Sequence, residues 1–234
     1  MRTKGYYHFK PSNNLRRIIK DLVKGRIATF EITIPEGYTV EDIALRLKKI
    51  TLHQEKDFLK VAQKKEMINS LVNISDDNSI KYYVEGFLYP DTYIIPLEYS
   101  PKKILKVMIN QFKQKWNKDM EDKLKSAKFN LYDYITIASL IEKEAKLDKE
   151  KPLISAVIYN RLKKDMPLQI DASVQYILPE WKNRLLYKDL KKESPYNTYL
   201  FKGLPQGPIC NPGDEAIKAA LEPADVEYLF YFAV

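Results

Sequence analysis

The sequence predicts an α+β fold, in which a small module of short strands and helices precedes a mostly helical region with short strands. The first observation is the alternation of polar and apolar residues in ATFEITI (28–34), which is typical of a half-buried strand. The second is the i, i+3, i+4, i+7 spacing of apolar residues in several other segments, which is typical of amphipathic helices. A chain of 234 residues with 45% hydrophobic residues can bury a substantial core.

The first fifty residues contain the signals of the small module. YYHF (6–9) is predicted to be a strand, and ATFEITI a second one. A helix is predicted between them, with Asn13-Asn14 as turn and cap and Gly25 as its stop. Its apolar face would consist of Leu15, Ile18, Ile19 and Leu22. After the turn PEGY, Thr39 is predicted to cap a helix. The apolar face of that helix would consist of Val40, Ile43, Leu47 and Ile50.

The remaining elements are mostly helices joined by loops. Residues 53–80 are polar and rich in lysine, with helical spacing up to about Leu71 and a loop at 73–79. EGFLYPDTYIIP (85–96) is expected to be extended or to form a short strand. Helices are then predicted at 101–128, 131–146, 152–164, directly after Asp171, and at the end of a loop-rich stretch, 194–223.

Charge and motif content narrow the classes of function. Lys plus Arg number 39 against 31 for Asp plus Glu, which favours an anionic partner such as nucleic acid, a membrane face or an acidic cell-wall polymer. The basic residues are dispersed along helices, however, which favours an ordinary solvated surface and argues against a nucleic-acid partner. Nucleotide-binding glycine motifs are absent from the sequence. With one cysteine, Cys210, and the distant His8 and His53, we predict neither a metal site nor a cofactor.

The segment ASLIEKEA (138–145) places two glutamates in an otherwise apolar helix. On a helical wheel, Glu144 falls roughly 50–60° from the centre of the apolar face, and Glu142 more than about 100° away on the other side. A carboxyl beside apolar neighbours has a raised pKa, as a general acid requires. The alternative is a surface helix in which both acids are solvated, and the wheel alone does not decide between them.

Two later segments combine the amide, hydroxyl and aromatic groups that a sugar site needs. LQIDASVQY (168–176) carries Gln169 and Asp171, and SPYNTY (194–199) carries Tyr196, Asn197 and Thr198. Two alternatives stay open: Asp171 could be only a helix N-cap, and the tyrosines could be half-buried packing residues.

The motifs together resemble one known family. ASLIEKEA, VIYNRLKKDMPLQIDASVQY, SPYNTYLFKGLPQGPICNPG and EGFLYPDTY (85–93), in their order and spacing, are similar to the YceG-like family of endolytic murein transglycosylases. The resemblance covers essentially the whole chain. It implies a LysM-like module with a helical insert at 1–80 and a lysozyme-like, YceG-like catalytic domain at 81–234.

The resemblance also implies a chemistry. Such enzymes cleave the β-1,4 bond between MurNAc and GlcNAc within peptidoglycan strands and leave 1,6-anhydroMurNAc ends. One glutamate acts as acid and then as base, and no cofactor or metal takes part. In related lytic enzymes the acid ends a helix and precedes a small residue, so Glu144 is assigned this role and Glu142 a structural or secondary one. Gln169, Asp171, Tyr196, Asn197 and Thr198 would line the glycan groove.

The resemblance implies a location and partners as well. We expect a single-pass anchor in the plasma (inner) membrane, an extracytoplasmic catalytic domain, and cell-wall synthases as possible partners. No apolar run here approaches the ~20 residues of a membrane span. A predicted strand at the last residues and the abrupt start suggest truncation, with the anchor and a C-terminal segment missing. A noncatalytic envelope protein that binds glycan or acts as a scaffold is the alternative.

Overall fold

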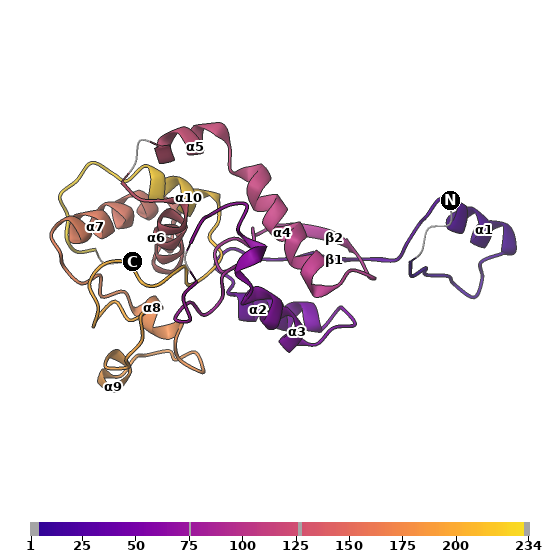
Figure 1. Cartoon of the computed structure of the whole chain (residues 1–234), viewed down its shortest axis with the longest axis horizontal. Helices are drawn as coiled ribbons and strands as arrows, with labels where there is room; N and C mark the ends of the chain where they lie inside the picture. Colours follow the sequence, from indigo (N-terminus) through magenta and orange to yellow (C-terminus); the bar gives the residue numbers. More distant parts are fainter. Residues whose placement is uncertain (1–4, 75, 126–127, 232–234) are drawn as a thin grey trace.

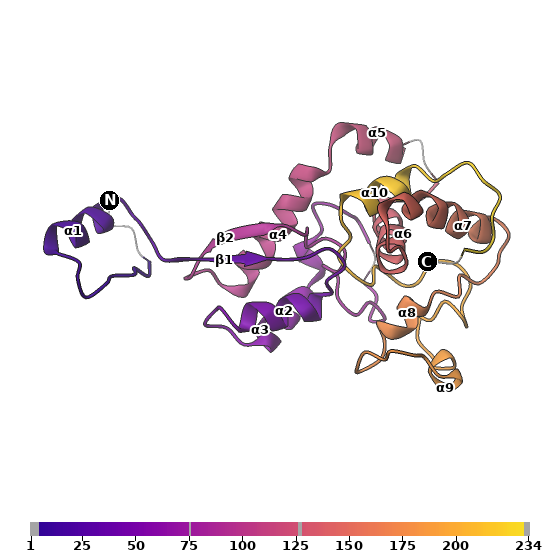
Figure 2. The ribbon, with the colours of Figure 1, turned by 180° about the vertical axis from the view of Figure 1, so that it is seen from behind.

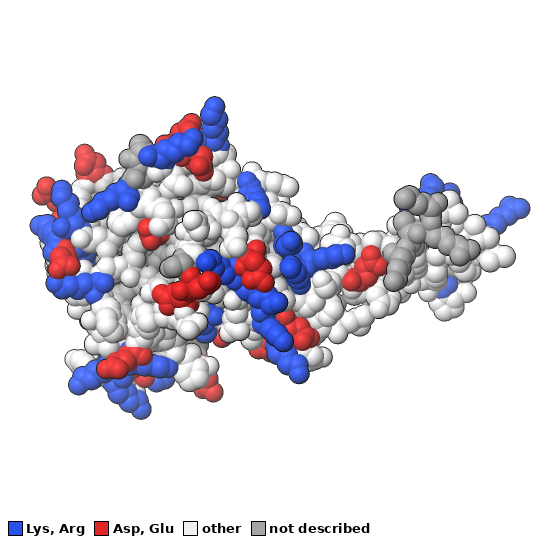
Figure 3. Space-filling view, viewed as in Figure 1, with Lys and Arg blue, Asp and Glu red and all other residues white. Residues whose placement is uncertain are grey.

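A computed structural model describes residues 5–74, 76–125 and 128–231. It shows an elongated molecule with a large body and an extended arm that carries helix α1 (Leu15–Val23) at its far end (Figures 1 and 2). Helices dominate, and the described strands form one two-stranded sheet, so the predicted α+β class is confirmed. On the face in Figure 3, lysine and arginine side chains are interspersed with acidic ones over the body.

The arm keeps the predicted helix but not the predicted strand. Asn14 caps α1 by accepting a hydrogen bond from the Arg17 N–H, and Gly25 follows the helix with φ 62°. The prediction of a strand at 6–9 is wrong. These residues are not buried, and the bond from the Ala28 N–H to the Tyr6 carbonyl does not extend into a ladder. An alternating pattern forms a strand only where one face can be buried.

The sheet joins segments that are far apart in the sequence. Strand β1 (Thr29–Thr33) confirms the prediction at 28–34, and it pairs antiparallel with β2 (Thr92–Pro96), so that Ile32 lies opposite Tyr93. Of the segment 85–96, which was expected to be extended or a strand, only the second half is a strand.

Two helices of the N-terminal half pack against each other beside the sheet. Helix α2 (Val40–Lys48) has the predicted cap, because Thr39 and Asp42 exchange hydrogen bonds in a capping box. Helix α3 (Glu55–Ala62) and a 3-10 turn, η1 (Lys65–Met67), occupy part of the stretch that was predicted to be helical up to Leu71. Helix α3 in turn contacts α4 (Pro101–Lys115).

The single helix predicted at 101–128 is two helices, α4 (Pro101–Lys115) and α5 (Lys118–Lys125). The chain leaves the helical conformation at Trp116, whose ψ is 96°, and Asn117 accepts a hydrogen bond from the Met120 N–H at 3.0 Å. A side chain that caps a new helix competes with the continuing helix, so Asn117 explains the break. Residues 126–127 lie outside the described part.

The rest of the body is built around α6 (Leu131–Glu144), against which α7 (Lys151–Lys163) and α10 (Asp214–Leu221) pack. The 3-10 turn η2 (Asp148–Glu150) precedes α7, and the short helices α8 (Asp171–Gln175) and α9 (Tyr187–Leu190) lie in the loops between α7 and α10. These confirm the helices predicted at 131–146, at 152–164 and after Asp171.

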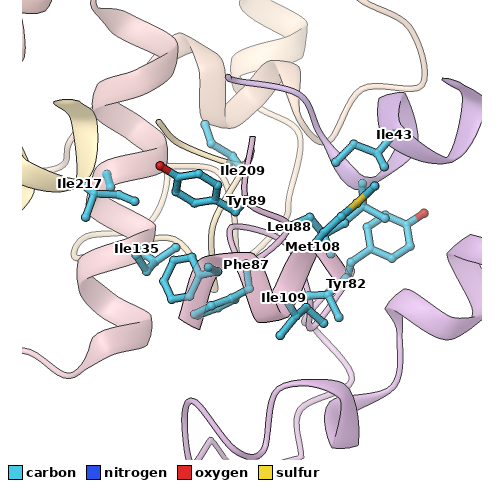
Figure 4. Close-up of a cluster of buried hydrophobic side chains, with 14 of the residues drawn as sticks. Ile43, Tyr82, Phe87, Leu88, Tyr89, Met108, Ile109, Ile135, Ile209 and Ile217 are labelled. Carbon is cyan, nitrogen blue, oxygen red and sulfur yellow. The ribbon is translucent and has the colours of Figure 1, made fainter. Parts of the chain in front are cut away.

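One hydrophobic core runs through both halves of the chain. Figure 4 shows the 87–89 segment between Ile135 and Ile217 on one side and Ile43 and Met108 on the other. Gly86 permits this path because it has φ 84° and because a Cβ there would lie 2.5 Å from Ile135. The sheet and the core thus connect residues on both sides of position 80/81, and the division into two domains there stays a prediction.

The described part of the C-terminal segment lies along α7 and forms no strand there. Asn160 Nδ2 donates to the carbonyls of Val226 and Tyr228, and Arg161 Nε donates to the Leu229 carbonyl at 2.7 Å. Residues 228–231 have no strand partner among the described residues, and 232–234 lie outside them. Within the described ranges, no helix combines the length and the apolar character that crossing a bilayer requires.

Candidate active site

Helix α6 carries Glu144 from the core to the surface. Its first turn is fixed by Asn130 and Asp133, each of which accepts a hydrogen bond from the other's backbone N–H. Between Leu131 and Ile141 nearly every side chain is buried. Ala145 has an extended backbone with ψ 132°, so the helix stops directly after Glu144. A rigid, buried helix therefore holds this carboxyl in a fixed position.

Glu144 sits in a largely desolvated environment with two hydrogen-bond donors. The Tyr231 hydroxyl donates to Glu144 Oε2 at 3.0 Å, and the backbone N–H of Ala172 also bonds the carboxylate. Burial raises the pKa of Glu144, and the nearby Asp171 charge raises it further, whereas the two hydrogen bonds lower it. Burial is the largest effect, so the pKa stays above its ordinary value. Such a carboxyl can hold a proton closer to neutral pH than a solvated glutamate can.

Glu142, two residues earlier, faces a different environment. Its Oε2 lies 3.4 Å from Lys151 Nζ and accepts a hydrogen bond from the Gly213 N–H at 3.3 Å. The Lys151 and Glu142 side chains are only 6% and 10% exposed. Glu142 therefore ties the end of α6 to the first residues of α7 and to the N-terminus of α10. This geometry favours the structural role over the secondary catalytic one.

A second carboxylate, Glu36, packs against the same junction. A Cβ on Gly213 would lie 1.9 Å from the Glu36 carboxyl carbon, so the carboxyl occupies the space beside this glycine. Burial and the charge of Glu142 raise the pKa of Glu36. Glu36 belongs to the loop before α2, so it brings the N-terminal half of the chain against α10.

Two of the predicted groove residues, Gln169 and Asp171, are exposed, and the charge of Asp171 lies close enough to Glu144 to raise its pKa. Gln169 is exposed and has φ 52°, and its N–H donates to the Thr198 carbonyl at 3.0 Å. Asp171 is the exposed first residue of α8, and its Oδ1 accepts a hydrogen bond from the Tyr199 hydroxyl at 2.5 Å. Ile170 is the N-cap of α8, so the interpretation of Asp171 as only that cap is wrong.

The other three predicted groove residues are buried. Asn197 donates to the carbonyls of Leu190 and Lys192, and Thr198 Oγ1 accepts the Ile170 N–H at 2.9 Å. The Tyr196 hydroxyl accepts from the Lys81 N–H, and Tyr196 is 3% exposed. With their polar atoms bonded inside the protein, these residues favour a supporting role over direct contact with a sugar. They hold the loops that carry Gln169 and Asp171.

Sequence reasoning missed several residues that shape the site. Tyr231, which bonds Glu144, was not predicted, and Tyr199, which belongs to the predicted sugar-site segment SPYNTY, was not expected to bond Asp171. Arg161 is buried, donates to the Leu168 carbonyl at 2.6 Å as well as to Leu229, and so fixes the segments on both sides of Glu144. The sequence signal for this role was the position of Arg161 in YNRL, within one turn of the end of an apolar helix. An arginine that is buried there needs several hydrogen-bond acceptors from neighbouring segments.

Glu85 is another buried carboxylate that sequence reasoning missed, in the junction between the two halves of the chain. It accepts hydrogen bonds from the Val40 N–H, from Asn211 Nδ2 and from the Tyr176 hydroxyl, each at 3.0 Å for the closest oxygen. Burial raises its pKa to about 8, although the bonds from Val40 and Tyr176 and the charge of Lys81 oppose that shift. It is fully enclosed, so it is a structural carboxylate.

A large hollow lies elsewhere on the described part of the chain. A hollow of about 790 Å³ is lined by Lys128, Tyr134 and Tyr159 among others, beside the first half of α6. Glu144 lies at the opposite end of that helix, and the acid that lines the hollow is Asp133, which is engaged in the helix cap. The chemistry-bearing groups therefore gather at the end of α6 and not at this cavity.

The fold and the site together define a mixed helical protein with a desolvated glutamate at a helix end. Comparison with known proteins gives its class: the model of the YceG-like family matches residues 2–234. The chain belongs to the YceG-like family, as its motifs predicted.

Relatives and a solved structure agree with this assignment. A Bacillus subtilis protein named endolytic murein transglycosylase is 36% identical over 239 residues, which cover 98% of this chain and 66% of that protein. A Streptococcus pneumoniae protein of the same name is 30% identical over 261 residues, covering 98% and 46%. The crystal structure of a putative yceG-like protein from Listeria monocytogenes matches with a TM-score of 0.81 and 36% identity, over 97% of this chain and 78% of that one. This chain thus spans about two thirds and about half of the length of the two named relatives.

Proposed function

We propose that this chain is the catalytic part of an endolytic peptidoglycan lytic transglycosylase. The observation that carries the proposal is the position of Glu144 at the partly buried end of a buried helix, where burial raises its pKa and Tyr231 holds it. Membership of the YceG-like family and the names of the two relatives supply the reaction class.

In the proposed reaction, the protonated Glu144 donates its proton to the glycosidic oxygen between C1 of MurNAc and C4 of GlcNAc. The C1–O bond breaks as the C6 hydroxyl of the same MurNAc closes on C1. The Glu144 carboxylate then removes the hydroxyl proton. The products are a 1,6-anhydroMurNAc end and a GlcNAc with a free 4-hydroxyl, and no water is added. Glu144 ends the cycle protonated, as it began.

An internal nucleophile removes the need for the second carboxylate of an ordinary glycosidase. Asp171 is close enough to raise the pKa of Glu144 and is the residue to test if water proves to be the nucleophile. In the proposed mechanism Asp171 accepts a hydrogen bond from Tyr199 and, with the exposed Gln169, faces the glycan beside the acid.

Mass spectrometry of purified glycan strands after incubation with the protein tests the reaction. Products that end in 1,6-anhydroMurNAc are expected. Products one water heavier would identify a hydrolase and turn attention to Asp171→Asn. No product, with strand binding retained, would favour the alternative of a noncatalytic glycan-binding or scaffold protein. The Glu144→Gln variant, which should bind but not cleave, is the matched control.

Cleavage of peptidoglycan requires that the site face the cell wall. We therefore include in the proposal an extracytoplasmic catalytic domain, a single-pass membrane anchor and cell-wall synthases as partners. Surface accessibility of the protein to an impermeant label on intact cells tests the location, and co-purification with glycan-polymerising enzymes tests the partnership.

A further inference from the structure

A groove runs alongside the end of α6, between the two halves of the chain. One wall is the 36–42 segment, and the other is α8 with the loop after it. Two adjoining hollows, of about 230 and 400 Å³, share Asp42, Lys143 and Trp181. Lys143 Nζ donates to the Gly37 carbonyl at 3.3 Å, so this lysine connects α6 to the opposite wall.

The groove begins beside the proposed acid. Ala172 lines it, and the N–H of the same residue bonds Glu144. Lys143 is the neighbour of Glu144 on α6. A linear polymer that places one bond at Glu144 can therefore continue past α8 into the groove.

Trp181 lines this groove from a loop that hydrogen bonds of the neighbouring residue hold in place. Its side chain is 67% exposed, and Lys143 Nζ lies 5.6 Å from the ring centroid. The next residue, Lys182, is clamped by Gln175, whose Nε2 donates to its carbonyl at 2.5 Å and whose Oε1 accepts its N–H at 3.2 Å. Lys182 Nζ also pairs with the nearly buried Asp189 at 2.6 Å. The loop thus keeps a large apolar ring in water, which is unfavourable unless a ligand covers the ring.

The chemistry of the groove suits a carbohydrate. An indole face can stack on the C–H face of a pyranose ring, and the carboxylates of Asp42 and Glu180 around it can accept hydrogen bonds from sugar hydroxyls. Glu41 also lines the groove, but its carboxylate is engaged by Lys81 and Tyr82. These acids outnumber the one lysine that lines both hollows, which disfavours a polyanionic ligand such as nucleic acid.

We propose that Trp181 is the stacking platform of a glycan subsite that lies outside the reacting pair of sugars and is built jointly by residues 36–42 and the loop after α8. The inference rests on the proposed function, since it names where a further ring of the same strand binds. Its consequence is a preference for long strands, because only these reach from Glu144 to Trp181. The N-terminal half of the chain then takes part in binding substrate.

Binding of peptide-free glycan strands to the Glu144→Gln protein tests this subsite separately from catalysis. In that background, Trp181→Ala should weaken binding of long strands by about tenfold, the usual size of an aromatic anchor. Trp181→Phe should recover part of the loss, because a smaller ring still stacks. Tyr187→Ala, which removes an 87% exposed aromatic from the same region, is the matched control and should bind as tightly as the parent.

Equal binding by the Trp181→Ala and parent proteins, or an equal loss in the Tyr187→Ala control, would overturn the subsite. A loss for a single disaccharide as large as that for long strands would also overturn it, because it would place Trp181 at the reacting pair. Failure of the wild-type protein to form 1,6-anhydroMurNAc ends would count against the proposed function instead. Mass spectrometry of the products detects that failure, whereas the binding assay tests the subsite.

Discussion

Glu142 and Glu144 belong to the same turn of α6, but they differ in almost every physical respect. Glu142 has a close cation, Lys151, and a backbone donor from the N-terminus of α10. Glu144 has no ion-pair partner among the described residues and receives bonds from a tyrosine hydroxyl and one backbone N–H. The comparison teaches that the surroundings of a carboxylate decide its use: a cation and a backbone donor hold Glu142 in place, whereas burial raises the pKa of Glu144.

The largest expected effect is the loss of cleavage activity on replacing Glu144, which distinguishes this residue from Glu142. Glu144→Gln removes the proposed proton donor and acceptor but keeps the size of the side chain, so cleavage of glycan strands should fall by roughly 100-fold or more. The melting temperature should change little. The release of 1,6-anhydro products measures the first quantity and thermal unfolding the second. Unchanged cleavage would show that the acid is another residue.

Glu85 extends the comparison to a carboxylate that is enclosed on all sides. Its pKa in the folded protein is raised from 4.5 to about 8, so between these values the native state binds the extra proton. Folding stability should therefore fall as pH rises from about 5 to 8, by at most about 1.4 kcal/mol per pH unit for this one group. Urea unfolding across this range measures the slope.

The Glu85→Gln variant supplies the control for that slope. The amide that replaces the carboxyl cannot titrate, so the curve of this variant should be flatter than that of the wild type by the contribution of Glu85. Glu144 also has a raised pKa and contributes in the same direction, so the Glu144→Gln protein gives a second subtraction. Parallel curves for the wild-type and Glu85→Gln proteins would show that Glu85 is charged throughout this range.

Glu142→Gln should reduce stability rather than catalysis. The change leaves Lys151 without one of two anionic partners, and Asp148 at 2.9 Å remains, so the loss should be about 1–3 kcal/mol. Denaturant unfolding measures it, and kcat of the folded variant should stay near the wild-type value. Adding Lys151→Met should recover part of the loss, because the uncompensated charge is then gone. A large fall in kcat at unchanged stability would instead assign Glu142 to the chemistry.

The smallest expected effect is that of replacing Tyr231, whose hydroxyl donates a hydrogen bond to Glu144. The Tyr231 hydroxyl lowers the pKa of Glu144, so Tyr231→Phe should raise that pKa further. In the proposed mechanism the protonated Glu144 starts the reaction, so activity should fall as pH rises through its pKa. The alkaline limb of kcat/KM against pH should therefore move to higher pH, with less than about a tenfold change at the optimum. Tyr228→Phe, in the same segment, is the control and should leave the profile in place.

The parts of the site that local patterns predicted are those that lie on one element. The helix at 131–146 and the position of Glu144 at the border of its apolar face followed from residue spacing, and burial and the raised pKa agree with that expectation. The cap at Thr39 was predicted from an equally local pattern, and the cap at Asn130, which was not predicted, also joins residues three positions apart.

The parts that escaped prediction depend on distant contacts. Tyr231 reaches Glu144 across 87 positions, and β1 pairs with β2 across more than fifty residues, so neither follows from spacing. SPYNTY has the composition of an exposed binding loop, but the side chains of Asn197 and Thr198 form hydrogen bonds with backbone atoms of neighbouring segments. Composition identifies which groups can form hydrogen bonds, whereas the fold decides whether the partner is a ligand or the protein.

The contact of Glu36 with Gly213 has a consequence for how such sequences can diverge. Because a Cβ at 213 would overlap the Glu36 carboxyl in its present position, a side chain at 213 requires this carboxyl to move away from α10. We expect that relatives with a larger residue at the position of Gly213 carry a shorter residue at the position of Glu36. An alignment would then show these two positions varying together in chains whose N-terminal half packs against α10 in this way.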